Sequence, residues 1–454
     1  MAEHRSATAA SRTLHRFLFI AALVFLACAP LRTIKAQVVP FTPPVAAGEP
    51  GSELTIYLLT FGQGDEVWEL FGHNAIWIKN QSLGTDIAYN WGMFDFAQPN
   101  FVTRFLTGDT SYWLEGFPLD AMLPAYRARN RSILAQELNL TPAQRLQLQR
   151  LVEENALPEN KFYRYDYYRD NCSTRLRDML DRGLSGQLSR ATSGIVTTDT
   201  YRSHTERLTQ RNVPVYAGIM LALGHPADRP LSVWEEMFLP VRMANRLRDV
   251  KVEGPGIAIP LVRSEMTLFT AGRAPEPAKP PRLLPFYIAG GIFLAGLLVA
   301  LVSRAESGGR LAMFGATLIT MLWSFIAGFF GTALVAAWTL TKHFFMGWNE
   351  NLLQLNPISL LLFVLIPLAF YSARGQSKAR KLSAWVAVLS MAGFLAQGVE
   401  QFSQRNGEII GLALPLNLAV VWAVFRLTAF RRARGTELLT ATEKDTDARG
   451  QKHG

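Results

Sequence analysis

The chain has 454 residues, a formal net charge of +10 and 49% hydrophobic residues. Its two cysteines cannot build a disulfide framework, and no Cys/His spacing typical of a zinc site is present. We therefore expect no metal and no cofactor. The basic residues of the C-terminal half lie at the ends of apolar runs, which is how membrane proteins set their orientation, so we expect no nucleic-acid partner.

The first segment, residues 1–36, is typical of a signal peptide or an N-terminal anchor. Basic residues precede the apolar run Phe17–Ala29, and Ala36 ends a candidate cleavage site. Cys28 follows a poor match to a lipoprotein motif and is interpreted as an incidental residue of the apolar run. Residues 37–52 form a Pro-rich lead-in. The part that follows is expected outside the cytoplasmic membrane.

Residues 53–95 are predicted to be β structure around one short helix at Glu66–Leu70, with strands at Leu54–Thr60, His73–Ile78 and Asp86–Gly92. If the last two strands form a hairpin, residue 79 pairs with 86 and residue 75 with 90. His73 and Asn90 then lie diagonally on one face, within side-chain reach. A register slip of one residue would place them on opposite faces.

The next segments complete a predicted catalytic domain over residues 53–250. Asn100–Leu114 is expected to begin as a helix, with its aromatic residues Phe101, Phe105, Tyr112 and Trp113 in the core. Thr141-Pro142 predicts the start of a helix that runs to about Asn155. Residues 185–212, which include His204, are expected to form a flexible loop over the site. Two further helices are predicted at 233–238 and 242–248, and residues 251–282 are interpreted as a Pro-rich linker.

Cys172 lies at a sharp local change in the sequence. The two residues before it, Asp170 and Asn171, are both good helix N-cap residues, and a helical apolar pattern follows as far as Gly183. Cys172 is thus expected in the first turn of a helix, where unpaired N–H groups favour a thiolate. The alternative is a buried structural cysteine.

Residues 283–430 are predicted to form an all-α transmembrane domain of five helices. The apolar runs lie at about 283–302, 311–338, 352–373, 383–399 and 409–425, the last two being short. Basic residues crowd the first loop, the third loop and the segment after the last helix, so these parts are expected to be cytoplasmic. Residues 431–454 would be a cytoplasmic tail, and the catalytic domain would lie on the opposite, periplasmic side.

One loop expected on the periplasmic side, His343–Pro357, mixes aromatic and amide side chains. It fits an aromatic membrane belt followed by an Asn-Pro helix start. It equally fits a surface that contacts a lipid headgroup or an acceptor substrate. His343, Asn349 and Asn351, together with His204, are therefore weak candidates for substrate binding.

A nucleophilic cysteine needs a base, and the base needs an orienting group. His73 opens a strand and is the preferred base for Cys172, and Asn90 could hold its imidazole through the side-chain oxygen. The backbone N–H of Cys172, with a neighbouring donor, could form an oxyanion hole. Spacing alone makes this pair weak evidence, and His204 would be the next candidate base.

A series of blocks in a fixed order makes the pattern more specific. The blocks are Tyr57–Asp65, Leu70–Ala75, Tyr89–Phe96, Pro99–Phe101, Tyr112–Leu114, Asn160–Tyr163 and Asp170–Arg175. In these blocks residues 53–180 resemble the Lnb N-terminal periplasmic domain family, from which Phe61 and Trp91 depart. The resemblance implies an α+β papain-like fold of the permuted NlpC and lecithin:retinol acyltransferase type. It also implies His73 as base, Cys172 as nucleophile, and N-acylation of bacterial lipoproteins at the outer face of the inner membrane.

Three functions remain open on the sequence. The preferred one is a membrane-bound thiol acyltransferase that takes an acyl chain from a phospholipid donor and passes it to a diacylglyceryl-lipoprotein acceptor. The second is a papain-like cysteine amidase or peptidase acting on cell-wall peptides. The third is a membrane-anchored binding module in which Cys172 is inert.

Overall fold

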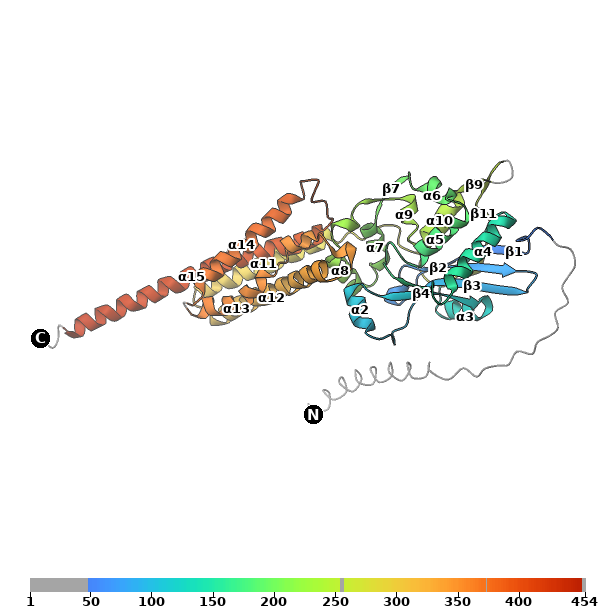
Figure 1. Ribbon diagram of the computed structural model, residues 1–454. Coiled ribbons are helices and arrows are strands. Elements are labelled where there is room, and N and C mark those ends of the chain that lie inside the picture. Colours follow the sequence, from blue (N-terminus) through green and yellow to red (C-terminus); the bar gives the residue numbers. More distant parts are fainter. Residues whose placement is uncertain (1–47, 254–256, 373, 451–454) are drawn as a thin grey trace, which may run out of the picture. The chain divides into compact units, whose positions relative to one another are not determined.

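The computed structural model describes residues 48–253, 257–372 and 374–450. The predicted signal segment 1–36, with Cys28, lies outside the described residues. The described residues belong to one compact unit, in which a mixed α/β region precedes five apolar helices (Figure 1).

The α/β region is built on a seven-stranded sheet with the strand order β11-β5-β1-β2-β3-β4-β6, in which all neighbours are antiparallel. The strands are β1 (Leu54–Phe61), β2 (His73–Asn80), β3 (Thr85–Met93), β4 (Ser111–Pro118), β5 (Ile133–Leu138), β6 (Phe162–Arg164) and β11 (Val262–Phe269). β1 is apolar on both faces because both faces are covered. Leu54, Ile56 and Leu58 point into one core, and Tyr57 and Leu59 point into another.

The helices of the α/β region are α2 (Phe101–Thr107), α3 (Leu119–Ala128), α4 (Pro142–Ala156), α5 (Cys172–Gly183), α6 (Gln187–Thr192), α7 (Tyr201–Thr209), α8 (Val213–Ala222), α9 (Val233–Glu236) and α10 (Pro240–Asp249). Of these, α3, α4, α5 and α10 contact the strands of this sheet. Short 3-10 helices lie at η1 (Val67–Glu69) and η2 (His225–Ala227). Leu148 of α4, Leu176 of α5 and Met243 of α10 share the core of the first face, and Met122 of α3 belongs to the second. The site therefore sits on a sheet that is supported from both sides.

The hairpin register predicted from the sequence is confirmed. Lys79 pairs with Asp86 and Ile76 with Tyr89 in the β2–β3 ladder. The strands extend further toward the turn than predicted, because Asn80 and Thr85 also pair. This register places residues 73 and 90 on the same face, and β2 begins at His73, at the end of the sheet.

Two expectations for the α/β region are wrong. Residues 185–212 do not form a loop over the site but fold into α6, α7 and the strand β7 (Val196–Thr200), which pairs with β8 (Pro230–Ser232). Thr200 forms a capping box with Ser203, and this box starts α7. Residues 251–282 are not only a linker, because they hold the hairpin of β9 (Lys251–Glu253) and β10 (Ala258–Pro260) and the edge strand β11.

Five helices among the described residues are long and apolar enough to cross a membrane. They contain α11 (Leu284–Glu306), α12 (Arg310–Leu340), α13 (Ile358–Tyr371), α14 (Gln376–Ala396) and α15 (Gly407–Gly450), with the 3-10 helices η3 (Phe344–Met346) and η4 (Glu350–Leu353) ahead of α13. α14 begins seven residues before its predicted run, because its basic residues lie inside the helix. α15 likewise continues through the predicted tail, so neither of the last two helices is short.

Candidate functional site

Cys172 is the first residue of α5, and the cap of that helix is fully formed. The Asn171 side-chain oxygen accepts from the N–H groups of Ser173 and Thr174, at 2.8 and 2.9 Å. Its Nδ2 donates to the carbonyl oxygens of Tyr167 and Phe238, at 3.0 and 3.1 Å. Both the oxygen and the nitrogen of the Asn171 side-chain amide are thus hydrogen-bonded, and this fixes the turn that presents the Cys172 thiol.

The start of α5 is fastened to the start of β2. The Asn74 side chain lies 2.9 Å from Ser173 Oγ. With its amide oxygen facing that hydroxyl, its nitrogen reaches Thr60 Oγ1 and the Leu59 carbonyl oxygen, at 3.0 and 3.3 Å. Asn74 follows His73 and Ser173 follows Cys172, so this buried contact holds the two candidate catalytic residues at one end of the sheet.

A hydrogen bond of 3.1 Å joins His73 Nε2 to Asn90 Oδ1. The orientation of the Asn90 amide is set by the Ala88 carbonyl oxygen, which accepts from Asn90 Nδ2 at 3.0 Å. The amide oxygen therefore faces His73, and Nε2 must carry the proton. It follows that Nδ1 of His73 keeps its lone pair and is the nitrogen that can accept a proton.

Burial, followed by the charge of Arg131, lowers the pKa of His73 to about 4, although the bond to Asn90 raises it. Burial also raises the pKa of the Cys172 thiol above its ordinary value. The N–H groups of Asn74 and Ser173 oppose this rise without overcoming it. The thiolate expected from the helix N-terminus is therefore wrong for the resting site, since desolvation outweighs the helix end. At neutral pH the pair is a thiol and a neutral imidazole.

Arg131 is a site residue that the sequence did not reveal. It is buried, and its Nε donates to the Gly62 carbonyl oxygen at 2.9 Å while Nη1 pairs with the buried Glu69 at 3.2 Å. Its guanidinium lies 4.8 Å from the centre of the Tyr126 ring, which in turn stacks on Phe61. Its partners Gly62 and Glu69 come from a distant segment of the chain, so the sequence near Arg131 carries no indication of a site residue and shows only that Arg131 lies close to the apolar residue Ile133.

His204 lies away from these residues, in a closed network of charges. It is fully buried, and its Nδ1 accepts from Arg207 Nε at 3.0 Å while Nε2 faces Glu236 Oε1 at 3.3 Å. Asp199 completes a cluster that has the residue types of a metal site. A metal on Nε2 would move the ring proton to Nδ1, where Arg207 already donates. The cluster is therefore better explained as an ion-pair network.

The loop around His343 does face the α/β region, and its polar groups are used in that contact. His343 Nε2 lies 3.0 Å from the Phe105 carbonyl oxygen. Asn349 and Asn351 each donate to the Leu221 carbonyl oxygen at 3.0 Å, at the end of α8. Gly224 packs so closely that a Cβ there would lie 2.0 Å from the Gly347 carbonyl oxygen. The two asparagines thus act in the junction between the α/β region and the apolar helices.

Comparison with known proteins bears on the α/β region. No curated protein and no solved structure matches the chain in the corresponding searches. A family model does match, and its range includes the strands β1 to β6, the cap of α5 and both residues of the Cys172–His73 pair. Residues 48–207 match the Lnb N-terminal periplasmic domain, the family that the sequence blocks predict.

Proposed function

We propose that this protein is a membrane-bound thiol acyltransferase. The α/β region would be a papain-like catalytic domain on the periplasmic side of the bacterial inner membrane, with the C-terminus in the cytoplasm. The observation that carries the proposal is the hydrogen bond between His73 Nε2 and Asn90 Oδ1, because it leaves Nδ1 free to act as a base at the end of the sheet where α5 presents Cys172.

In the first half of the reaction the Cys172 sulfur attacks the ester carbonyl carbon of a phospholipid. His73 Nδ1 takes the thiol proton as the C–S bond forms, and gives it to the leaving oxygen as the C–O bond breaks. The products are an acyl-thioester on Cys172 and a lysophospholipid. Because the resting site is neutral, this proton transfer must accompany the attack.

In the second half the free α-amine of a diacylglyceryl-cysteine on a lipoprotein attacks the thioester. His73 accepts the proton that the amine loses and returns it to the Cys172 sulfur as the C–S bond breaks. The lipoprotein gains an amide and the enzyme regains its thiol. The N–H groups of Asn74 and Ser173, which favour negative charge on the Cys172 sulfur, are suited to stabilising the departing thiolate.

Lipid substrates are supported by the attachment of the site to the apolar helices. Lys342 and His343, just after α12, contact the backbone of α2, at Thr107 and Phe105 respectively. A catalytic domain held at a membrane surface meets membrane-anchored donor and acceptor at high effective concentration. A peptidase acting on soluble peptides gains nothing from this attachment.

The test is the N-terminal acylation of lipoproteins in cells whose only such enzyme is this protein, read by mass spectrometry. We expect Cys172→Ala and His73→Ala to leave diacylated lipoproteins with a free α-amine, while Leu83→Ala, at an exposed hairpin position, leaves acylation intact. Unchanged N-acylation in both site variants would refute the proposal. Release of cell-wall peptides by the purified protein without lipid would favour the amidase instead.

A further inference from the structure

Five aromatic side chains form a connected surface beside the candidate site, here called the aromatic surface: Trp68, Phe94, Phe96, Phe101 and Phe105. Their ring centres lie 5.1 to 6.3 Å apart along the series. Trp68 is 52% exposed, Phe96 59% and Phe105 53%, so the expectation that Phe105 belongs to the core is wrong. Val102 and Leu106 on α2 extend the exposed apolar area.

One end of the aromatic surface lies at the level where the helix α12 ends. The Lys342 N–H donates to the Thr107 carbonyl oxygen at 2.7 Å, and Lys342 Nζ pairs with Asp109 at 2.8 Å. Leu340 is the last residue of α12, a candidate membrane span. Lys342, two residues later, contacts α2. If α12 spans the membrane, an exposed apolar patch at this height is expected to meet the bilayer.

The other end leads to the nucleophile. The Phe94 ring stacks on Tyr112 at 5.1 Å, and Tyr112 stacks on Tyr165 at 4.3 Å. Gly92, two residues before Phe94, lies against Cys172, since a Cβ there would be 3.5 Å from the cysteine Cβ. Ring contacts therefore connect Phe105, near the end of α12, with Phe94, which lies two residues from the glycine against Cys172.

We propose that the aromatic surface is seated in the outer leaflet and holds the acyl chain of the lipid whose ester reaches Cys172. The binding of the acyl chain by this surface rests on the proposed acyltransferase function, whereas the seating of the surface in the leaflet does not. Phe side chains suit this occupant because they bury apolar area against an acyl chain without leaving a polar group unsatisfied.

The first experiment tests the seating without any chemistry. A spin label is placed at Phe105→Cys or, as control, at Leu83→Cys, in a full chain that carries Cys28→Ala and Cys172→Ala. Leu83 is also exposed but lies in the β2–β3 turn, eight strand residues or about 25 Å from His73. In phosphatidylcholine vesicles we expect the label at 105 to collide with oxygen and the label at 83 with a water-soluble nickel chelate. Equal access of the chelate to both positions would overturn the proposal.

The second experiment tests whether the aromatic surface holds the acyl chain of the lipid. The active protein with Phe96→Ala and Phe101→Ala is compared with its parent for thioester formation on Cys172, using a sixteen-carbon and a six-carbon phosphatidylcholine. We expect at least a tenfold loss with the long chain and less than a twofold loss with the short one, because only the long chain reaches the surface. Equal losses would overturn the chain-binding role. Thioester formation with neither lipid in the parent would refute the acyltransferase function and leave the seating to the spin labels.

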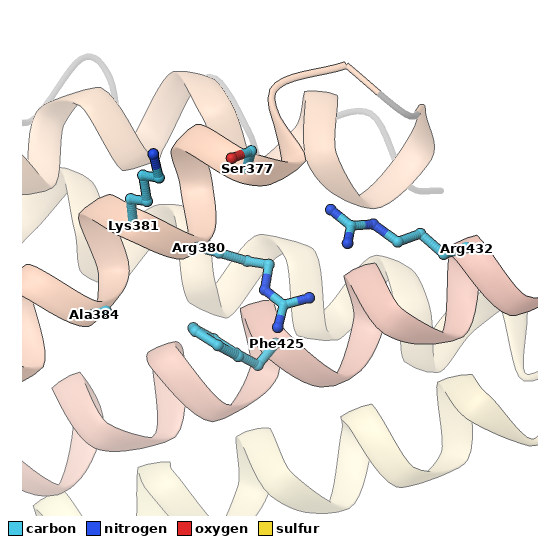
Figure 2. A pocket seen from close by; sticks show the side chains of 6 residues that line it. All are labelled: Ser377, Arg380, Lys381, Ala384, Phe425 and Arg432. Carbon is cyan, nitrogen blue, oxygen red and sulfur yellow. The ribbon is translucent and has the colours of Figure 1, made fainter.

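A separate observation lies at the other end of the apolar helices. A cavity of about 330 Å³ opens between α14 and α15, lined by Ser377, Arg380, Lys381, Ala384, Phe425 and Arg432 (Figure 2). The Arg380 guanidinium lies over the Phe425 ring, 4.2 Å from its centre. Among the side chains that the structure describes, no carboxylate lies within ion-pair distance of Arg380 or Lys381. The opposite end of α14 leads to Arg405, which pairs with Glu206 of the α/β region.

We infer that this cavity binds the phosphate of an anionic phospholipid in the leaflet opposite the α/β region. Three cationic side chains and a hydroxyl offer charge and donors to a phosphate, while Phe425 and Ala384 offer apolar contact to the glycerol and chains. This inference does not depend on the proposed reaction. It commits to a lipid rather than free phosphate because the cavity lies between two membrane helices.

Native mass spectrometry of the detergent-solubilised full chain tests this site, with phosphatidylglycerol as the probe and phosphatidylcholine as the neutral comparison. Arg380→Gln/Lys381→Gln is matched by Arg374→Gln/Lys378→Gln, which removes the same charge nearby but outside the cavity. We expect at least a tenfold loss of bound phosphatidylglycerol in the first variant only. Equal binding by both variants, or displacement by an equal concentration of inorganic phosphate, would overturn the inference.

Discussion

Among the histidines that the structure describes, His204 is fully buried and His73 is partly buried, and the two rings differ in what their second nitrogen can do. His204 has charged groups on both nitrogens, with Arg207 donating to Nδ1 and Glu236 facing Nε2. His73 has one neutral partner, Asn90, on Nε2. Burial lowers the pKa of both. Shielding therefore does not mark a base; a base is marked by a nitrogen whose lone pair is left available by the partner of the other nitrogen.

The fixed charges near the two rings also differ, because the carboxylate of Glu236 lies near His204 and the guanidinium of Arg131 lies near His73. Although burial raises the pKa of Glu236, hydrogen bonds from His204 and Arg246 lower it to about 2, so its negative charge is fixed. Around His73 the fixed charge is Arg131, which disfavours an imidazolium. The first arrangement holds a structure together, while the second keeps a ring neutral until a reaction supplies a proton.

The largest expected effect is the loss of His73. His73→Ala should slow thioester formation on Cys172 by about 10²–10⁴-fold, the usual worth of a general base. His204→Ala should leave the rate per folded molecule within about twofold. Intact-protein mass spectrometry after mixing with phospholipid measures both. Equal losses of thioester formation in the two variants would contradict the assignment of His73 as the base and of His204 as a structural residue.

Glu236→Ala, in the network around His204, is expected to lower the stability of the protein and to leave the rate of thioester formation per folded molecule unchanged. The substitution removes the carboxylate that Arg246 Nε binds at 2.8 Å, and it leaves Arg242 with Asp199 alone, at 3.7 Å. We expect a loss of about 3 kcal/mol, at the low end for a buried ion pair because both guanidinium groups are partly exposed. Denaturation of the detergent-solubilised protein measures it. Glu137→Ala, which removes the more exposed pair with Arg263, is the control and should cost less than about 1 kcal/mol.

Asn90→Ala tests whether the orienting hydrogen bond matters. Removing one neutral hydrogen bond of about 1 kcal/mol should lower the rate of thioester formation by roughly five- to tenfold. Asn90→Gln provides the same groups at the wrong reach and should not restore the rate. An unchanged rate in Asn90→Ala would show that Asn74 and its neighbours position His73 without Asn90.

The smallest effect is a flat pH profile. Since the pKa of His73 is lowered to about 4, its ring stays unprotonated down to about pH 5, and thioester formation should change little between about pH 5.5 and 7.5. A ring with the ordinary pKa of about 6.5 would lose about tenfold over that range. Single-turnover rates with phospholipid alone measure this, because no acceptor amine then titrates. A tenfold fall would contradict the neutral, shielded environment of His73.

Sequence reasoning found the parts of the site that local patterns encode. The Asp-Asn pair ahead of Cys172 predicted the cap and the helix start, and a hairpin between two neighbouring strands predicted the register that joins His73 to Asn90. Both signals lie within a few residues of the structure they determine. The five apolar runs were found for the same reason, since each carries its own hydrophobic signal.

The parts that were missed depend on distant partners. Residues 185–212 looked like a polar loop, yet Arg202 is buried by its ion pair with Asp228. β11 is largely exposed and polar, and it becomes a strand only because β5 offers it an edge. Arg131 takes its place in the site from Glu69 and Gly62. None of these pairings leaves a periodic trace in the residues themselves.

The junction at Gly224 has a consequence for substrate choice. Backbone groups meet there directly, with the Gly224 N–H donating to the Phe345 carbonyl oxygen at 2.7 Å and the His225 N–H to that of Trp348 at 3.2 Å. The side chains of Asn349 and Asn351 add hydrogen bonds to the Leu221 carbonyl oxygen, so several short contacts fix the spacing of the junction. For the proposed acyltransferase, such a joint would hold Cys172 at a constant height above the bilayer, so that only ester bonds at that height would reach the thiol.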